Sequence, residues 1–582
     1  MKIKFLNSLI LVLILSCQSK ISETTEVISE ISLEELSRNF KSPSKEYHPE
    51  TWFHLNGNNI SKEGLKLDLQ AIKDAGLQGI HLFNKSGRAF PNVKPVKILS
   101  PEWEELIRFA ADECQKLGLK FTMQNCPGWS MTGGPWVPAN EAQREVVETT
   151  YHVSGNQKFE NFLQIDSLYK TPDYNYKDIQ VLAFPTPEGD NSKAFNPNKI
   201  ETNNTVVPWE DIFNPDSKII VTRTTTRLDK ELNEYRNQGI SKVNGAATWV
   251  KTSFDKPITL RTITFPQTRH MIMGTNYPVV QVNLKVEAII EDNLKEIIAL
   301  KLPDANWNDR RKHLTLTIPE TKSNQFVFTL EGNHTIAPEF IRLSAKPRLH
   351  NHEAKAAKVL RRLKKEVQYN YAENTIIKPE TIINLTDKLS DEGKLTWSVP
   401  DGNWTIIRFG HINMRLTNKP AVPEATGWES SKLDKIAIEN HLKKGMIGNL
   451  IKDGGPIGDG KLHGLLIDSW ESHVPTWTIN SEDMFKEFEQ RRGYSMKTYL
   501  PATMGYVVDN VETTTKFLRD LRHTMDEVFI DNFFKHFATV AHNMGAEVYT
   551  EGAGGEVLPV DPMRYYGVSD IPMTEFWYPK AP

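Results

Sequence analysis

The chain has 582 residues, a formal net charge of −3, and a composition that is 39% hydrophobic and 25% charged. These values are typical of a globular protein with room for two to four domains. A nearly neutral chain has no overall attraction for nucleic acid, so we expect no nucleic-acid partner. The 13 Trp and 16 Tyr side chains suit stacking on sugar rings, although large cores also use these residues.

The N-terminus has the layout of an export signal. Two lysines precede an apolar run at 9–15 that is too short to span a bilayer. The sequence "ILSC", ending at Cys17, is similar to a bacterial lipobox, in which the cysteine is lipidated; a plain secretory signal is the alternative. We therefore predict a signal peptide at 1–17, a flexible tether at 18–45, and a protein of the bacterial cell envelope that is lipid-anchored to the outer membrane.

From about residue 50 the pattern alternates between strands and helices. Strands are expected at 51–56, 77–83 and 119–125. Ser61 can cap the helix after the first strand, and Pro101 can occupy the first turn of the next helix. Strands that alternate with helices predict parallel βαβ units.

The pattern changes between about 141 and 400. Many short β-like runs follow one another, separated by Pro, Asn, Gly and Thr. This pattern is typical of an antiparallel β-sandwich. A basic stretch from about residue 350 is predicted to be a helix with a solvated face.

The βα pattern resumes after residue 400. Further strands are expected at 404–411, 463–469, 546–551 and 571–577, with helices at 432–452, 481–492 and 512–545. The seven candidate parallel strands are one short of the eight that close a (β/α)₈ barrel. A doubly wound sheet is the competing architecture, but no glycine-rich phosphate turn follows the first strand.

We therefore predict an α/β fold built on an incomplete (β/α)₈-type barrel of about seven strands. The barrel is expected in two parts, 46–140 and 401–582, interrupted by an inserted antiparallel β-sandwich domain at 141–400.

Three carboxylates follow apolar strand cores in the second part: Glu471, Glu551 and Glu575. In barrel enzymes the catalytic groups sit at the carboxyl ends of the strands. Glycosidic cleavage needs two carboxyl groups, one as acid and the other as base or nucleophile. A single glutamate here could be a helix cap, but three at strand ends predict a catalytic cluster.

Other polar and aromatic side chains near the strand ends are candidates for sugar contacts. They are His54, Asn56, Asn125, Trp129, His411, Trp470, His473 and Trp577. The histidines do not have the paired spacing of a zinc site. Asparagine and carboxylate oxygens could ligate Ca²⁺, but no EF-hand loop is present.

Several long motifs, in order, resemble glycoside hydrolase family 106, the α-L-rhamnosidases of bacterial polysaccharide degradation. They include "WFHLNGNNISKEGLKLDLQAIKDAGLQGIHLF" (52–83), "QNCPGWSMTGGPWV" (124–137), "IDSWE" (467–471) and "YTEGAGG" (549–555). The resemblance implies a (β/α)₈ barrel with an inserted β-domain and a rhamnose-containing glycan of pectin or ulvan type as substrate. It also implies an inverting mechanism and a Ca²⁺ ion that holds the rhamnose hydroxyls.

The resemblance also implies roles for particular residues. Glu471 is the candidate general acid, and Glu551 and Glu575 compete for the role of base. Asn125 and Asn56 are the candidates for contacts with the ion or the sugar. Inverting geometry would place the acid and base about 6.5–9.5 Å apart.

Members of the family continue well past the "EFW" motif at 575–577, so we expect a chain that is either truncated or split, in the second case with another polypeptide that completes the barrel. Two alternatives stay open. One is a glycan-binding lipoprotein that has lost turnover, and the other is a barrel hydrolase for another sugar such as a uronic acid.

Overall fold

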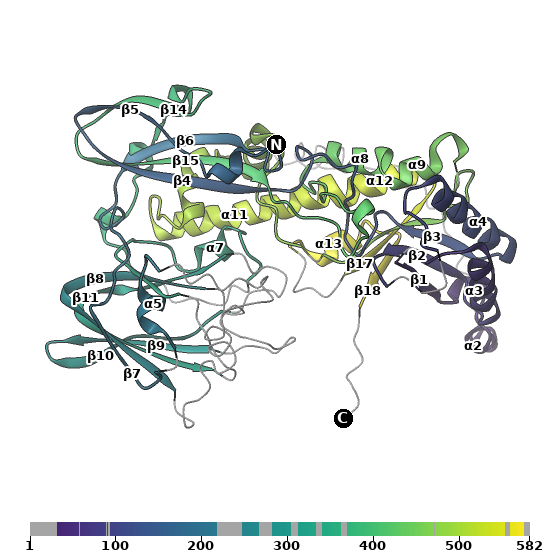
Figure 1. Ribbon diagram of the computed structural model, residues 1–582, viewed down its shortest axis with the longest axis horizontal. Helices are drawn as coiled ribbons and strands as arrows, with labels where there is room; N and C mark the ends of the chain where they lie inside the picture. Colours follow the sequence, from purple (N-terminus) through teal and green to yellow (C-terminus); the bar gives the residue numbers. More distant parts are fainter. Residues whose placement is uncertain are drawn as a thin grey trace, which may run out of the picture.

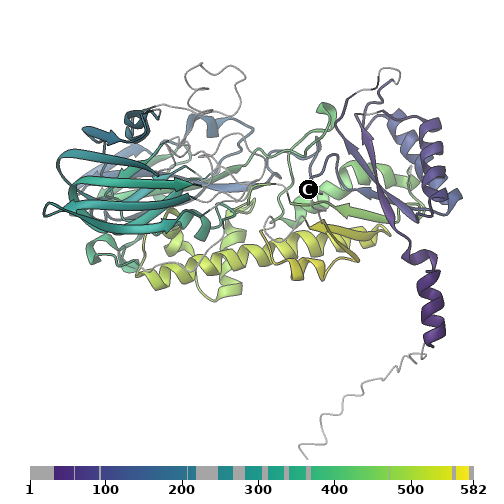
Figure 2. The same cartoon turned by 90° about the horizontal axis from the view of Figure 1, so that it is seen from below.

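The computed structural model describes residues 32–57, 59–88, 90, 94–205, 207–217, 247–266, 282–303, 312–332, 340–361, 369–455, 457–470, 472–552 and 559–575. The molecule is elongated (Figure 1). A parallel sheet with its helices forms one end, and antiparallel β-sheets form the other. The long helix α11 (Val511–Phe529) runs from the antiparallel sheets toward the parallel sheet, as Figure 2 shows from below.

Six strands form one parallel sheet in the order β1-β2-β3-β16-β17-β18. They are β1 (Glu50–Asn56), β2 (Gly79–Lys85), β3 (Lys120–Gln124), β16 (Gly464–Ile467), β17 (Glu547–Gly552) and β18 (Ile571–Thr574). Six of the seven predicted parallel strands are therefore confirmed. Within the described residues the sheet is open, with β1 and β18 at its edges, so no closed barrel is seen.

The remaining prediction, a parallel strand at 404–411, is wrong. This segment is β15 (Asn403–Asn413), which pairs antiparallel with β4 (Arg144–Ser154) and β6 (Lys177–Pro185). Nearly every residue of β15 is buried, and a strand buried on both faces reads the same in a parallel or an antiparallel sheet. The boundary predicted at 400 is therefore too early, because the chain returns to the parallel sheet only after β15.

The described residues of the antiparallel region form three sheets. The largest joins β7 (Lys199–Thr202), β8 (Thr248–Phe265), β9 (Val282–Ile290), β10 (Asn293–Lys301), β11 (Leu314–Gly332) and β12 (Arg342–Ser344). The others join β4, β6, β13 (Ile383–Asn384) and β15, and β5 (Gln157–Phe162) with β14 (Lys394–Val399). Antiparallel structure in this region agrees with the sequence. The predicted long helix from 350 is only α7 (His352–Lys355), and residues 362–368 lie outside the described residues.

Helices were predicted well where their ends carry capping signals. Helix α4 (Pro101–Leu117) has Pro at its first turn and ends at Gly118, whose φ of 66° is left-handed. Ser61 accepts a hydrogen bond from the Gly64 amide at 3.1 Å and so caps the start of helix α3 (Lys62–Asp74). The other helices beside the sheet are α8 (Lys435–Lys444), α9 (Met446–Ile451), α12 (Lys535–Asn543) and α13 (Pro562–Tyr566). Helix α10 (Ser481–Arg492) instead packs on α11, and its first residue, Ser481, contacts β6 and β15 of the antiparallel region.

The parallel sheet has two chemically distinct faces. On the outer face, alternate residues such as Leu82, Met123 and Leu465 are buried in the main core together with helices α3 and α4. On the inner face, Phe83, Leu466 and Tyr549 form a small separate cluster. Because successive side chains of a strand point to opposite faces, the residue two positions after each inner residue also faces inward.

The segment predicted as a flexible tether contains helix α2 (Leu33–Lys41), which Ser32 caps and which buries no residue. Cys17 and the rest of 1–31 lie outside the described residues. Among the described residues, no helix has both the length and the apolar character that a membrane span requires. Cys114 and Cys126 are free, buried thiols.

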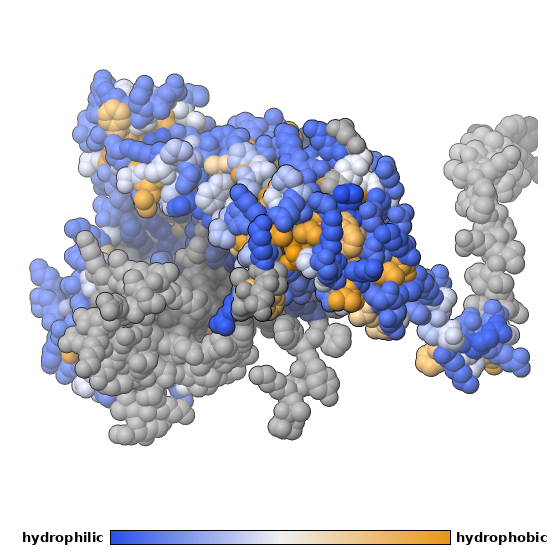
Figure 3. All heavy atoms as spheres, turned by 45° about the vertical axis from the view of Figure 1, so that its right-hand side comes forward, coloured by the Kyte–Doolittle hydropathy of each residue, from blue (hydrophilic) through white to orange (hydrophobic). Residues whose placement is uncertain are grey.

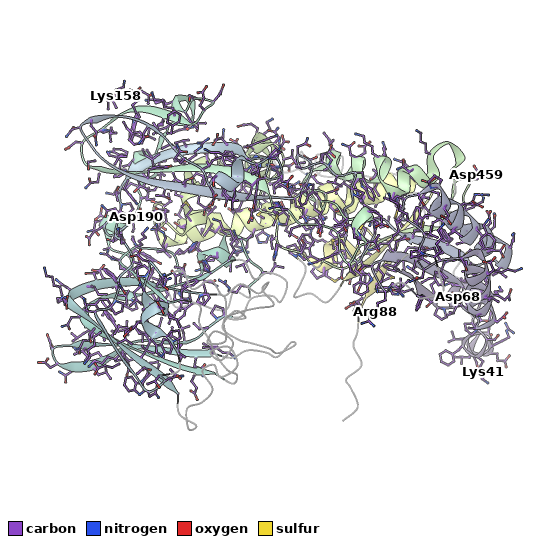
Figure 4. The ribbon with its side chains drawn as sticks, in the orientation of Figure 1. Lys41, Asp68, Arg88, Lys158, Asp190 and Asp459 are labelled. Atoms are coloured by element: carbon purple, nitrogen blue, oxygen red, sulfur yellow. The ribbon has the colours of Figure 1, made fainter. Side chains whose placement is uncertain are left out.

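One buried carboxylate joins the antiparallel sheets to the rest of the chain. Asp190, labelled in Figure 4 between the two β-rich lobes, is 0% exposed. Its carboxylate accepts hydrogen bonds from Arg348 at 2.5 Å, from the Tyr506 hydroxyl at 2.9 Å and from Thr405 at 3.3 Å. The guanidinium of Arg348 also lies 3.8 Å from the centre of the Tyr506 ring. These contacts hold four distant segments of the chain together.

The amino ends of the parallel strands hold a second polar group. Glu50 of β1 pairs with His81 of β2 at 2.9 Å and with Lys120 of β3 at 3.4 Å, and it accepts from Tyr549 of β17 at 3.3 Å. Burial alone would raise the pKa of Glu50, but His81 and then Lys120 outweigh burial and hold that pKa below its usual value. Four strands are thus linked through one ionised carboxylate.

We expect Glu50 to contribute stability that is lost in acid. Its folded-state pKa is lowered, so the contribution is present above the unfolded-state pKa near 4.5 and disappears as the pH falls through the lower folded-state value. Thermal melts of the wild type and Glu50→Gln between pH 3 and 7 test this. The two melting temperatures should converge toward acid, and a difference that stays constant with pH would contradict the expectation.

Candidate active site

Three carboxyl groups meet at the carboxyl ends of adjacent strands. Asp468 lies two positions after inner-face Leu466, and Glu551 lies two positions after inner-face Tyr549. Glu575 follows Met573, which packs on the same inner-face cluster. Strand alternation therefore projects all three carboxyl groups from the inner face.

Glu551 is the centre of this group. It is 3% exposed, and its Oε2 accepts a hydrogen bond from the Ser469 amide at 3.1 Å. Burial, then the hydrogen bond and charge of Asp468, then the charge and hydrogen bond of Glu575 raise the pKa of Glu551 to about 10. Glu551 is therefore protonated at neutral pH.

Asp468 is held in place by fixed donors. It is 2% exposed; its Oδ1 accepts the Ser469 amide at 2.7 Å and its Oδ2 accepts the Gln124 side-chain amide at 3.2 Å. Gln124 reaches Asp468 from the neighbouring strand β3 of the same sheet. In contrast, Glu575 is exposed, so its carboxylate is accessible to water.

The geometry limits the roles that these groups can take. Glu551 forms a hydrogen bond with Glu575. An inverting acid and base stand about 6.5–9.5 Å apart, with water and sugar between them. Because Glu551 and Glu575 are within hydrogen-bond distance, they are too close to be the acid and the base of one inverting pair. Both therefore lie on the same side of a bound sugar. Glu471, the predicted general acid, lies outside the described residues.

A different set of groups occupies the opposite end of the same sheet face. His54 and Asn56 of β1 stand beside Phe83 and Lys85 of β2 in the strand register. The ring centres of His54 and Trp129 are 6.1 Å apart. Three predicted sugar-contact residues are thus brought together here.

Glycine 128 explains how Trp129 reaches this position. The φ of Gly128 is +96°, and a Cβ atom there would lie 2.7 Å from the Lys419 backbone. The Gly128 amide donates to Asn84 at 2.7 Å, and the Trp129 amide donates to Lys419 at 2.9 Å. Only glycine allows this close approach, so the loop after β3 folds back over the sheet end.

Asn125 does not face an open site. It is 1% exposed, and its side-chain nitrogen donates to the backbone oxygens of Leu466 at 2.7 Å and Met131 at 3.0 Å. Its oxygen pairs with His441 Nε2 at 2.7 Å. Burial, then the charge of Lys432, lowers the pKa of His441 to about 3, so this neutral ring donates its Nε2 proton to Asn125. Asn125 braces the loop instead of contacting sugar.

Two further candidates for sugar contacts lie in the core. His411 is fully buried in β15, where Arg144 donates to its Nδ1 and Ser481 contacts its Nε2 at 3.2 Å. Trp470 is 1% exposed and packs on Phe529 with ring centres 5.4 Å apart. Neither side chain presents an open surface to a glycan.

The remaining two candidates are less informative. His473 is half-buried in the loop that follows β16. Trp577 lies outside the described residues.

The two asparagines proposed as ion ligands do not fit a cation site. The Asn125 oxygen is taken by the His441 N–H, and the Asn56 oxygen accepts from the Lys85 ammonium at 2.9 Å. A neighbouring ammonium repels a metal ion. Within the part of the chain that the structure describes, no group of three or more His, Cys, Asp or Glu side chains could hold a metal.

Sequence reasoning missed some members of the site. The sequence pattern did not indicate Asp468 as the partner of Glu551, and it did not single out Gln124. Lys85 was missed because the expected second strand ended at Phe83, whereas β2 continues to Lys85. The period-two pattern of Phe83 and Lys85 was the available signal.

Paired carboxyl groups at the carboxyl ends of parallel strands, one protonated and one open to water, are the site of a glycoside hydrolase on an α/β fold. The family model of the α-L-rhamnosidases, glycoside hydrolase family 106, matches residues 41–581. The chain belongs to this family.

Two individual proteins are similar to this chain. The solved structure of a rhamnosidase from Novosphingobium sp. PP1Y has a TM-score of 0.72 and 26% identity, and the match covers 92% of this chain and 49% of that one. A curated relative from Formosa agariphila, described as a putative beta-glucuronidase, is 27% identical over 543 residues, which are 93% of this chain and 32% of the relative. The chain thus spans half or less of the length of these proteins.

We expect Asp468→Asn to make the site more sensitive to alkali. Removing this negative charge lowers the pKa of Glu551 below its value of about 10, although burial still keeps it raised. If turnover needs protonated Glu551, the alkaline limb of the kcat–pH profile moves to lower pH by about one unit or more. An alkaline limb that stays in place or moves upward would contradict this.

Proposed function

We propose that this protein is an α-L-rhamnosidase that removes terminal rhamnose from a complex glycan. Family membership supports the reaction, and the contact among Asp468, Glu551 and Glu575 supplies the chemistry.

We assign the base to Glu575. It is exposed to water, and the proton on Glu551 lets that side chain donate a hydrogen bond to it. Glu575 takes a proton from the attacking water, while the general acid, for which Glu471 is our candidate, gives its proton to the departing glycosidic oxygen. Water attacks from the side opposite the leaving group, so the anomeric centre inverts.

The direct test is rhamnose release. Purified protein should hydrolyse 4-nitrophenyl α-L-rhamnoside, and proton NMR of the first product should show the inverted β-anomer. Glu471→Gln should reduce turnover with an activated leaving group less than with a glycan, because 4-nitrophenolate departs without a proton. Retention of configuration would overturn the mechanism. Absence of turnover on any rhamnoside, with binding kept, would favour the glycan-binding alternative.

A hydrolase for a uronic acid is the second candidate, because the Formosa agariphila relative is described as a putative beta-glucuronidase. Parallel assays with 4-nitrophenyl glucuronide and rhamnoside separate the two. Preference for the glucuronide would replace our proposal.

Three further features are proposals from the sequence alone. They are a pectin- or ulvan-type glycan, an outer-membrane lipid anchor at Cys17, and a bound Ca²⁺. For the ion, the test is turnover after dialysis against EDTA, with and without added Ca²⁺. A Ca²⁺-dependent enzyme would lose turnover in EDTA and regain it on adding the ion.

A further inference from the structure

Lys85 places a positive charge at the carboxyl edge of the sheet, on the same face as the acidic cluster. It is the last residue of β2, two positions after inner-face Phe83. Its ammonium lies 5.1 Å from the centre of the Trp129 ring and donates to the Asn56 oxygen at 2.9 Å. Within the described residues it has no carboxylate partner. A half-buried lysine at the strand end without a counter-ion leaves its charge available to an anionic ligand.

The groups around Lys85 are those that bind an acidic sugar. The Trp129 ring offers a face for stacking, and the half-buried His54 ring stands beside it. Burial, then the charge of Lys85, lowers the pKa of His54, so the ring is neutral and can donate or accept a hydrogen bond. Trp52, at the edge of the sheet, is 39% exposed and lies 5.8 Å from His54 between ring centres.

The wider surface agrees with a binding edge. Arg88, three residues after Lys85, lies at the lower edge of the parallel sheet in Figure 4 and adds a second cation. Figure 3 shows an apolar area, in orange, enclosed by polar residues on the side of the molecule that carries this sheet. Sugars bind such mixed surfaces through ring stacking and directed polar contacts.

Charge is divided along the edge. Asp468 follows β16, Glu551 lies near the end of β17 and Glu575 follows β18, whereas Lys85 is the last residue of β2. Trp129, which lies beside Lys85, and Met573, two residues before Glu575, both pack against the inner-face cluster of Phe83, Leu466 and Tyr549. Lys85 is therefore close enough to contact a sugar that is joined to the rhamnose held at Glu575.

We propose that Lys85, with Trp129, Asn56 and His54, forms a subsite for an anionic sugar next to the rhamnose that is cleaved. The anion is the carboxylate of a uronic acid or a sulfate ester, since both offer charged oxygen acceptors to the ammonium. This inference rests on the proposed function for the sugar that is released, but the subsite itself is a binding site.

Three matched probes test the subsite: α-L-rhamnosyl-(1→4)-glucuronic acid, its 6-sulfated glucose counterpart, and neutral rhamnosyl-glucose. We expect Lys85→Met to raise Kd and KM for one or both acidic probes about 10–100-fold more than for the neutral probe. The probe that shows the larger ratio identifies carboxylate or sulfate. Lys85→Arg should restore part of the preference, and Lys66→Met, at an exposed position on α3, is the matched control.

Failure of the subsite and failure of the proposed function give different results. Kd is measured by calorimetry with Glu575→Gln protein, so no turnover is needed. Equal effects of Lys85→Met on all three probes would overturn the subsite, whether or not rhamnose is released. Loss of rhamnose release from every probe with the acidic preference intact would overturn the function and leave the subsite standing.

Discussion

Glu575→Gln is expected to reduce kcat for α-L-rhamnoside hydrolysis by about 10²–10⁴-fold, the usual contribution of a general base. Glu575 is the exposed member of the carboxyl group, so it is the one that can reach water. Neutral Gln cannot accept the proton. Substrate binding should change little, because the substitution keeps the size of the side chain.

The matched comparison is Glu551→Gln. Glu551 is protonated at neutral pH, and Gln keeps a neutral side chain with an N–H donor for Glu575. We therefore expect kcat to stay within about tenfold of the wild type, and Glu551→Ala to cost more, because it removes the donor and leaves a cavity. Steady-state kinetics of the three variants, with Glu547→Gln at the far end of β17 as control, measure this. A larger loss for Glu551→Gln than for Glu575→Gln would exchange the two roles.

The largest stability effect is expected at Asp190. Asp190→Asn leaves the buried guanidinium of Arg348 without its counter-charge, and removing one partner of a buried pair costs about 3–5 kcal/mol. The substitution also weakens the acceptors for Tyr506 and Thr405.

Chemical denaturation followed by tryptophan fluorescence measures the effect, and the transition that reports the antiparallel sheets should move most. Asp387→Asn, at an exposed position, is the control and should lie within about 0.5 kcal/mol of the wild type. Equal shifts for both variants would show that the buried pair does not hold the segments together.

Local signals account for the elements that the sequence predicted well. Helix α4 carries Pro at its start and Gly after its end, and six short apolar strands are spaced by helices. The prediction of a parallel strand at β15 failed because its hydrophobic run is the same in either kind of sheet. Only its partners, β4 and β6, decide whether it pairs parallel or antiparallel. Its misplacement carried His411 into the predicted site.

The residues of the candidate site also divide into those that local sequence could indicate and those that it could not. Position after a strand was enough to indicate Glu551 and Glu575, because parallel strands bring their carboxyl ends to one edge. Position after a strand could not indicate that Asn125 and Trp470 are enclosed by the loop and helix packed on them. Burial depends on contacts between residues that are distant in the chain.

The sequence by itself determined the family, the parallel βα order and two of the carboxyl groups, since these follow from motifs and from patterns within a few residues. Only the tertiary structure decided that Asp468 and Glu575 both raise the pKa of Glu551, and that Lys85 lies on the same face of the sheet. A pKa and a subsite depend on distances across strands and on exclusion of water, and neither quantity exists until the sheet is assembled.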